Sequence, residues 1–254
     1  MNTPLVVGNW KMYGSQSDCV GLARKIALAI SGKPTLAQVV IAPPYTALVA
    51  AKRAIRNSQV RLAAQNCHWQ ESGAFTGEIS PTMLRDIGCE FVIVGHSERR
   101  HIFHESDAMI AQKLKAILAQ GMRAILCVGE TLEERRLGTT TSIISRQLRV
   151  ALKGLSKSAI DKIEIAYEPV WAIGTGLNAT PEQISQVHKR IRRFLLASFG
   201  SAKGNRVRIL YGGSVKPENA VGLARISEVG GLLVGGASLK TDSFLPIVRC
   251  FDDK

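Results

Sequence analysis

The stretch FVIVGHSERRHIFHESDAMIAQKLKAILAQGMRAILCVG, residues 91–129, contains one complete strand–helix–strand unit. Its two β-branched ends predict strands, and the segment between them predicts a helix. Ser106 can cap that helix, and Gly121 lies just beyond its end. The apolar stripe of the helix consists of Ile110, Leu114, Ile117 and Leu118. Because both strand runs are continuously apolar, they are typical of parallel strands buried on both faces.

Eight such apolar runs occur along the chain, with helical patterns between them. They are PLVVGNW from Pro4, QVVIAPP from Gln38, VRLAAQN from Val60, FVIVGH from Phe91, RAILCVG from Arg123, IEIAYEP from Ile163, RVRILYGG from Arg206 and GLLVGG from Gly231. The count and the alternation predict an α/β protein, a (β/α)8 barrel in one domain over residues 1–254. A doubly wound open sheet is the alternative, because periodicity does not distinguish a closed sheet from an open one.

The chain is strongly basic, with 33 Lys and Arg against 20 Asp and Glu and a net charge of +13. Such a field attracts phosphates, anionic metabolites or nucleic acid. The basic residues occur in short groups, such as Lys189, Arg190, Arg192 and Arg193, which we interpret as solvated helix faces. A polyanion-binding module is an alternative function, but few aromatic residues are interleaved and no nucleic-acid motif is present. We expect no nucleic-acid partner.

The cysteines indicate a reducing compartment. Their number is odd, their spacing is wide and no C-x-x-C pair occurs, which argues against a disulfide framework or a zinc site. They are Cys19, Cys67, Cys89, Cys127 and Cys250. The N-terminus, MNTPLVVGNWKM, lacks the pattern of a signal peptide, and the longest uncharged stretch, 34–51, contains three prolines. We therefore expect a cytoplasmic protein that does not bind a membrane.

Polar residues and glycines follow the predicted strands at their C-terminal ends. They are Asn9 and Lys11, Gln65 and Asn66, His96, Glu130, Glu168, Gly212 to Ser214, and Gly235 with Gly236. In a parallel barrel these ends converge on one face, where barrel enzymes keep their sites. Lys11, His96 and Glu168 can therefore share a pocket.

These three side chains suit one kind of chemistry. A carboxylate can take a carbon-bound proton next to a carbonyl while an imidazole donates to the oxygen that gains charge. A nearby ammonium stabilises that oxyanion. Each residue alone is ordinarily part of a turn or a surface ion pair, so only their joint placement indicates catalysis. The pairs Gly212-Gly213 and Gly235-Gly236 can expose backbone N–H groups to a phosphate.

Three partial motifs do not predict a cofactor or a metal. Residues 174–179 fit G-x-G-x-x-A, but no acidic residue lies about twenty positions further on to hold a ribose. Residues 95–99 have Arg where a nucleophile elbow has its second Gly, and His101 with His104 and Glu105 matches no metal motif. We expect no metal and no cofactor.

Several segments together resemble the triosephosphate isomerase family over nearly the whole chain. They are Asn9-Trp10-Lys11-Met12, AQNCHWQESGAFTGEIS from Ala64, VGHSERR from Val94, CVGETLEER from Cys127, YEPVWAIGTG from Tyr167, YGGSV from Tyr211 and LVGGASL from Leu233. The resemblance implies a TIM barrel that interconverts dihydroxyacetone phosphate and D-glyceraldehyde 3-phosphate, a step of glycolysis and gluconeogenesis. It also implies an enzyme without metal or cofactor.

The resemblance further implies roles for single residues. Glu168 is expected to shuttle the proton through an enediolate, while His96 and Lys11 polarise the carbonyl and Asn9 binds the same oxygens. The expected phosphate ligands are Gly174, Ser214, Gly235 and Gly236. Glu98 and Cys127 are expected to support the site without touching substrate.

A homodimer, with the loop around Thr76 reaching into the partner's site region, is expected by the same resemblance. The residues themselves predict a lid over 169–179, because Pro169-Val170-Trp171 gives a stiff entry, Gly174 and Gly176 free the tip, and Thr180-Pro181 restarts a helix.

The chain departs from the usual family pattern at Tyr13, at Leu177-Asn178 and at Gly230, where an Asp is usual. An isomerase of four-carbon phosphosugars on the same scaffold is an alternative, because sequence does not measure the volume of a pocket.

Overall fold

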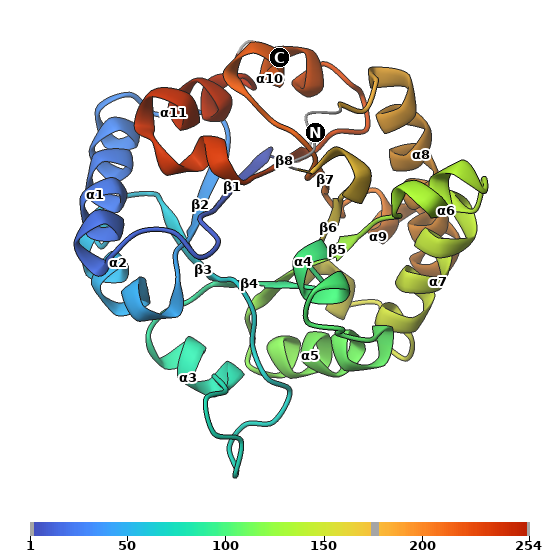
Figure 1. Ribbon diagram of the computed structural model, residues 1–254, viewed down its shortest axis with the longest axis horizontal. Coiled ribbons are helices and arrows are strands. Elements are labelled where there is room, and N and C mark those ends of the chain that lie inside the picture. Colours follow the sequence, from blue (N-terminus) through green and yellow to red (C-terminus); the bar gives the residue numbers. More distant parts are fainter. Residues whose placement is uncertain (1–2, 174–177, 253–254) are drawn as a thin grey trace.

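Eight parallel strands close into a barrel in the computed structural model, which describes residues 3–173 and 178–252 (Figure 1). The strands pair in chain order, and β8 pairs with β1, so the sheet has no edge. They are β1 (Leu5–Asn9), β2 (Gln38–Ala42), β3 (Arg61–Ala64), β4 (Phe91–Val94), β5 (Arg123–Val128), β6 (Ile163–Tyr167), β7 (Ile209–Tyr211) and β8 (Gly231–Val234). The predicted TIM barrel is confirmed, and the open sheet is excluded.

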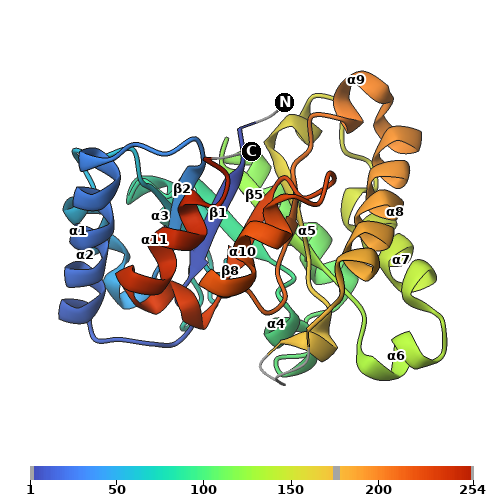
Figure 2. The same ribbon diagram turned by 90° about the horizontal axis from the view of Figure 1, so that it is seen from above.

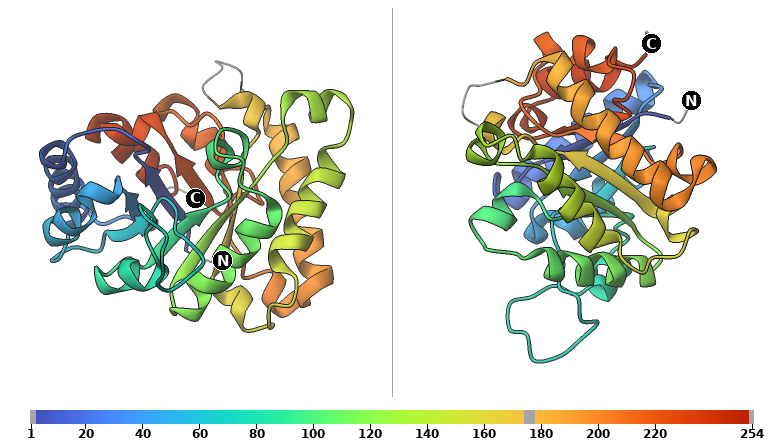
Figure 3. Two further views of the ribbon diagram at one scale, coloured as in Figure 1. Left: turned by 60° about the horizontal axis from the view of Figure 1, so that its bottom comes forward. Right: turned by 90° about the vertical axis from the view of Figure 1, so that its right-hand side faces the viewer.

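Helices surround the barrel, and the views from above and from the side show them as an outer layer (Figures 2 and 3). The α-helices are α1 (Gln16–Gly32), α2 (Leu48–Ala54), α3 (Pro81–Asp86), α4 (Ser97–His101), α5 (Asp107–Ala119), α6 (Leu132–Arg136), α7 (Thr140–Leu152), α8 (Pro181–Phe199), α9 (Ser201–Gly204), α10 (Pro217–Ala224) and α11 (Thr241–Arg249). The short 3-10 helices are η1 (Tyr45–Ala47), η2 (Ala159–Lys162), η3 (Val170–Ala172) and η4 (Gly236–Leu239).

The apolar strands are buried on both faces, as their sequences predict. One set of side chains fills the barrel interior, and it includes Val7, Val40, Ile93, Ile125 and Leu210. The alternate residues of the same strands pack against the helices in a larger cluster. Burial between two layers therefore explains why these runs show no polar alternation.

Helix α5 begins and ends where the sequence predicts. The Ser106 side chain accepts a hydrogen bond from Met109 N, and the helix ends just before Gly121. Gly121 has φ +74°, in the left-handed region that favours glycine after a helix. Local capping chemistry thus defines this strand–helix–strand unit.

The expectation of a solvated basic face on α8 is wrong for Arg192. Lys189, Arg190 and Arg193 are exposed, but Arg192 is half-buried. Its Nε forms a 3.2 Å ion pair with Glu228, and its Nη1 donates to Val207 O at 2.8 Å. Periodicity placed this residue on the outer face, whereas the chain after α9 folds back over it and supplies acceptors. Part of the positive charge is therefore structural.

Two further features concern membranes and thiols. Within residues 3–173 and 178–252, no helix has both the length and the apolar character that a bilayer crossing needs. All five cysteines are buried.

Candidate active site

A cavity of about 510 Å³, here called the site cavity, opens at the C-terminal ends of the strands. Most of the predicted site residues line it, although they come from five different strand ends. They are Asn9, Lys11, His96, Glu168, Ser214, Gly235 and Gly236. The predicted phosphate ligand Gly174 lies outside the described residues. Barrel topology alone brings the other seven together.

Glu168 follows β6 directly and is 2% exposed. Its backbone N–H donates to Val128 O at 2.8 Å, which continues the pairing of β6 with β5 beyond the strand. A Cβ on Gly129 would lie 1.7 Å from Glu168 O, so only glycine allows the two chains to approach this closely. The neighbouring strand β5 therefore fixes the position of the Glu168 backbone, from which the carboxylate extends.

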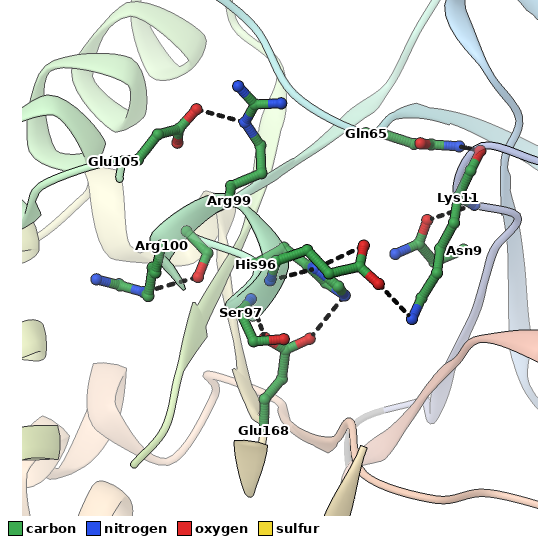
Figure 4. Close-up of polar contacts among 11 residues, drawn as sticks. Asn9, Lys11, Gln65, His96, Ser97, Arg99, Arg100, Glu105 and Glu168 are labelled. Atoms are coloured by element: carbon green, nitrogen blue, oxygen red, sulfur yellow. Dashed lines mark hydrogen bonds and ion pairs between the residues drawn. The ribbon is translucent and has the colours of Figure 1, made fainter. Parts of the chain in front are cut away.

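One oxygen of the Glu168 carboxylate accepts a hydrogen bond, and the other lies beside the His96 ring (Figure 4). Oε2 accepts a 2.8 Å hydrogen bond from the backbone N–H of Ser97, the first residue of α4. Oε1 is buried 3.1 Å from His96 Nε2, yet it makes no well-aligned hydrogen bond within the described part of the chain. A buried carboxylate oxygen without an aligned donor is unusual away from functional sites.

The hydrogen bonds of His96 assign its ring nitrogens. Nδ1 accepts from the backbone N–H of Glu98 at 3.3 Å, at the start of α4. An imidazole that accepts at Nδ1 carries its proton at Nε2, the nitrogen that faces Glu168. His96 can therefore donate from Nε2 to an oxygen in the site cavity.

Cys127 lies in the barrel interior near the base of Glu168. Burial raises the pKa of the Cys127 thiol well above its usual value, and the nearby Glu168 carboxylate raises this pKa further. The thiol is therefore protonated at neutral pH and adds no charge beneath the carboxylate. Cys127 does not line the site cavity.

Lys11 reaches the site cavity from a strained backbone. Its φ of +50° is in the left-handed region, which costs a residue with a side chain about 1 kcal/mol or more. Lys11 N donates to Asn9 Oδ1 at 3.1 Å, and Gln65 Nε2 donates to Lys11 O at 2.8 Å. The loop thus holds the ammonium where a relaxed backbone would not.

Glu98 contacts both of the predicted polarising residues. Its Oε1 forms a 2.8 Å ion pair with Lys11 Nζ, and its Oε2 lies 3.5 Å from His96 Nδ1. Glu98 itself does not line the site cavity. Its carboxylate therefore acts on the cavity through Lys11 and His96.

The glycine-rich turns after β7 and β8 line the same cavity. Among the described residues, no loop or turn hydrogen bond uses the backbone N–H of Ser214 or of Gly236, which begins η4. Gly235 lies next to Lys11, since a Cβ there would be 3.4 Å from Lys11 Cε. Backbone donors and an ammonium thus surround one end of the cavity, an arrangement suited to a phosphate.

Other polar residues at the strand ends bind side chains around the cavity and do not line it. Glu130 is fully buried, and its Oε1 accepts from Tyr167 Oη, Trp171 Nε1 and Arg135 Nη1, each at 3.1 Å. It thereby anchors η3, where the predicted lid begins. Of the predicted lid, the structure describes residues 169–173 and 178–179. Asn66 accepts from the buried Lys113 at 2.9 Å and lies outside the cavity.

Sequence reasoning missed Ser97. Its contribution is a backbone N–H, which every residue but proline has, so its side chain gave no signal. The available signal was positional, because a helix that begins directly after a site strand exposes N–H groups toward the site. Among the described residues, no group of three His, Cys, Asp or Glu side chains is arranged to hold a metal.

Comparison with known proteins identifies the family. The family model described as triosephosphate isomerase matches residues 4–251. The chain belongs to the triosephosphate isomerase family. The triosephosphate isomerase of Syntrophotalea carbinolica is 47% identical over 98% of both chains. That of Geobacter metallireducens is 48% identical over 98% of this chain and 99% of its own.

A solved triosephosphate isomerase structure has the same fold. The crystal structure of the Bartonella henselae protein superposes with a TM-score of 0.89 and is 40% identical, covering 98% of this chain and 99% of its own. As a triosephosphate isomerase family member, this chain is an isomerase that interconverts dihydroxyacetone phosphate and D-glyceraldehyde 3-phosphate. Its substrates are small triose phosphates, which excludes the four-carbon alternative as its principal reaction.

Proposed function

We propose that Glu168 is the base that moves the proton between C1 and C2 of the triose phosphate. The observation that carries this proposal is the buried Oε1, 3.1 Å from His96 Nε2 in the site cavity that also contains Lys11. A carboxylate with little water around it is a stronger base toward a carbon-bound proton. Removal of that proton generates an enediolate. Return of the proton to the neighbouring carbon, together with transfer of the hydroxyl proton from the oxygen on C1 to the oxygen on C2, completes the isomerisation.

His96 and Lys11 stabilise the oxygen on which negative charge develops. His96 donates from Nε2, and the ammonium of Lys11 supplies the opposite charge. Asn9, whose Oδ1 already orders the Lys11 backbone, offers its amide N–H group to the same oxygens.

The phosphate binds at the other end of the site cavity. We assign its ligands to the backbone N–H groups of Ser214, Gly235 and Gly236, and to Gly174, which lies outside the described residues. Within the part of the chain that the structure describes, the N–H groups of Ser214 and Gly236 make no loop or turn hydrogen bond, which supports this assignment. Holding the phosphate there fixes the two reacting carbons relative to Glu168.

Exchange of substrate hydrogens with D₂O tests the role of Glu168 directly. In Glu168→Gln we expect deuterium incorporation and kcat to fall by about 10²–10⁴-fold, the usual effect of losing a positioned base. Thermal unfolding should show that the variant is folded. Glu133→Gln, at an exposed carboxylate of α6, is the control and should retain full exchange. Near-normal exchange in folded Glu168→Gln would contradict the assignment.

We further propose that the protein forms a homodimer through the loops after β1 to β4. These loops neighbour one another around the barrel, and they carry the exposed apolar residues Met12, Tyr13, Phe75, Ile102 and Phe103. The loop that contains Thr76 projects away from the barrel (Figures 1 and 3). A set of exposed apolar side chains of this size is typical of an interface.

Sedimentation equilibrium tests the dimer. We expect the mass of two chains at micromolar concentration, and a shift toward one chain in Ile102→Glu, because a charge would then be buried in the interface. A single-chain mass for the unmodified protein would contradict the proposal. The odd number and wide spacing of the cysteines support a reducing, cytoplasmic location, which cell fractionation can check.

A further inference from the structure

The turn over residues 212–216 joins β7 to α10 and lines one end of the site cavity (Figure 1). The barrel fixes the first half of this turn. Gly212 N donates to Tyr167 O at 2.8 Å, and a Cβ on Gly213 would lie 2.3 Å from Tyr211 Oη. The hydrogen bond and this close approach therefore leave the beginning of the turn little freedom.

One side chain, that of Asn219, holds the second half of the turn. Its Oδ1 accepts from Lys216 N at 2.8 Å, and its Nδ2 donates to Ser214 O at 3.0 Å. A backbone N–H on one side and a backbone carbonyl on the other allow only this orientation of the amide. The two bonds fix the peptide units before and after Val215, whose side chain is buried in the larger apolar cluster.

Ser214 has its carbonyl bound and its N–H available beside the site cavity. The carbonyl accepts from Asn219, whereas the N–H makes no loop or turn hydrogen bond within residues 3–173 and 178–252. A donor that is already held in place binds a ligand oxygen without the cost of ordering the chain around it. Asn219 therefore reduces the cost of binding an anion at Ser214.

Helix capping accounts for only one of the two Asn219 bonds. Asn219 is the third residue of α10, and a bond from that position to the N–H just before the helix is ordinary capping. Glu134 makes the same bond in α6, where its carboxylate accepts from Thr131 N at 2.8 Å. Capping needs only an acceptor, whereas the bond to Ser214 O needs a donor and reaches a residue outside the helix. The amide thus makes a contact that a capping carboxylate would not make.

We propose that Asn219 is a positioning residue for the phosphate of the triose phosphate, because it holds the turn whose Ser214 N–H binds a phosphate oxygen. The inference rests on the proposed assignment of the phosphate to this end of the site cavity. Asn219 does not itself line the cavity, so it acts through Ser214. Loss of its two bonds weakens binding of the phosphate dianion and leaves the proton-transfer groups, Glu168 and His96, in place.

A comparison of two substrates tests this role. In Asn219→Ala we expect kcat/KM for D-glyceraldehyde 3-phosphate to fall, and the inhibition constant of sulfate to rise, by about tenfold, the size of one charge-assisted hydrogen bond. For D-glyceraldehyde, which has no phosphate to position, kcat/KM should be unchanged. The control is Glu134→Ala, which removes a capping side chain from α6 and should leave all three values unchanged.

A second variant separates positioning from capping and keeps the test decisive if Asn219→Ala does not fold. Asn219→Asp keeps an acceptor for Lys216 N but has no donor for Ser214 O, so thermal unfolding should change little. We expect the same selective loss for the phosphorylated substrate. A normal kcat/KM for both substrates in either folded Asn219 variant would overturn the inference, and so would an equal loss for both substrates or an equal effect of Glu134→Ala.

Sulfate inhibition of the unmodified protein distinguishes two kinds of failure. If sulfate does not inhibit it competitively, the phosphate assignment is wrong and the role of Asn219 is wrong with it. If sulfate does inhibit it competitively and the folded Asn219 variants have normal inhibition constants, only the role of Asn219 is wrong.

Discussion

Lys11 Nζ and Glu98 Oε1 lie 2.8 Å apart, so a cation that lines the site cavity is paired with a carboxylate from a different strand end. Both side chains are partly exposed, at 23% and 37%, so solvent weakens the pair and its stability contribution is small. Its importance is geometric, because the Lys11 side chain has four rotatable bonds and the carboxylate selects one direction for it. Glu98 is therefore a positioning residue for Lys11.

The first prediction concerns Glu98→Gln. We expect kcat to fall by about tenfold, the size of one charge-assisted hydrogen bond, while KM changes much less. Glu98→Asp should recover part of the loss. Steady-state kinetics in both directions, with thermal unfolding as a check on folding, provides the measurement. An unchanged kcat, or a change in KM alone, would show that Lys11 needs no such partner.

The second prediction concerns Lys11 itself. Lys11→Met keeps most of the side-chain volume but removes the ammonium, so both substrate binding and turnover should weaken. The reason is that one cation serves the phosphate dianion in the ground state and the developing oxyanion in the transition state. The measurement is kcat and KM in each direction. A kcat/KM equal to that of the unmodified enzyme would remove Lys11 from the site.

The third prediction concerns the phosphate end. Inorganic phosphate or sulfate should inhibit competitively, because the N–H groups after β7 and β8 bind any dianion of that size. In Ser214→Asp the introduced carboxylate should repel the dianion, raising KM and the inhibition constant by at least tenfold. Inhibition kinetics with sulfate gives both values. If neither changes, the phosphate lies elsewhere in the cavity.

The barrel could be predicted because the residues that specify each of its units lie close together in the sequence. Each strand–helix unit carries its own burial pattern and capping residues, as at Ser106 and Gly121, and right-handed crossovers leave few ways to join eight such units. The candidate site followed from topology, since strand ends such as those before His96 and Glu168 must meet on one face.

Other features depend on contacts that no local pattern encodes. The Ser97 N–H after β4 reaches the Glu168 carboxylate after β6, and the Lys11 backbone, with its φ of +50°, accepts a hydrogen bond from Gln65 in another loop. The burial of Arg192 and Glu164 also depends on contacts with distant segments. Their charges predict solvent exposure, yet partners from distant segments make burial tolerable.

The final prediction concerns stability at acid pH. His188 on α8 is fully buried, with its Nδ1 3.2 Å from Glu228 O and its ring edge-on to Tyr167. Burial lowers the pKa of His188 from 6.5 to about 4. The unfolded chain therefore binds a proton at His188 more readily than the folded chain does. The contribution of neutral, buried His188 to the free energy of unfolding is fully present above pH 6.5. It is lost as the pH falls from there to about 4.

A change in pKa of this size is worth about 3 kcal/mol of unfolding free energy. His188→Gln cannot take up the proton, so its stability should depend less on pH than that of the unmodified protein over this range. Urea unfolding of both proteins between pH 7 and pH 4 measures the difference, and carboxylates that titrate in both cancel in the comparison. We expect the unmodified protein to lose about 3 kcal/mol more than the variant. Parallel profiles would mean that His188 is neutral and buried without controlling acid stability.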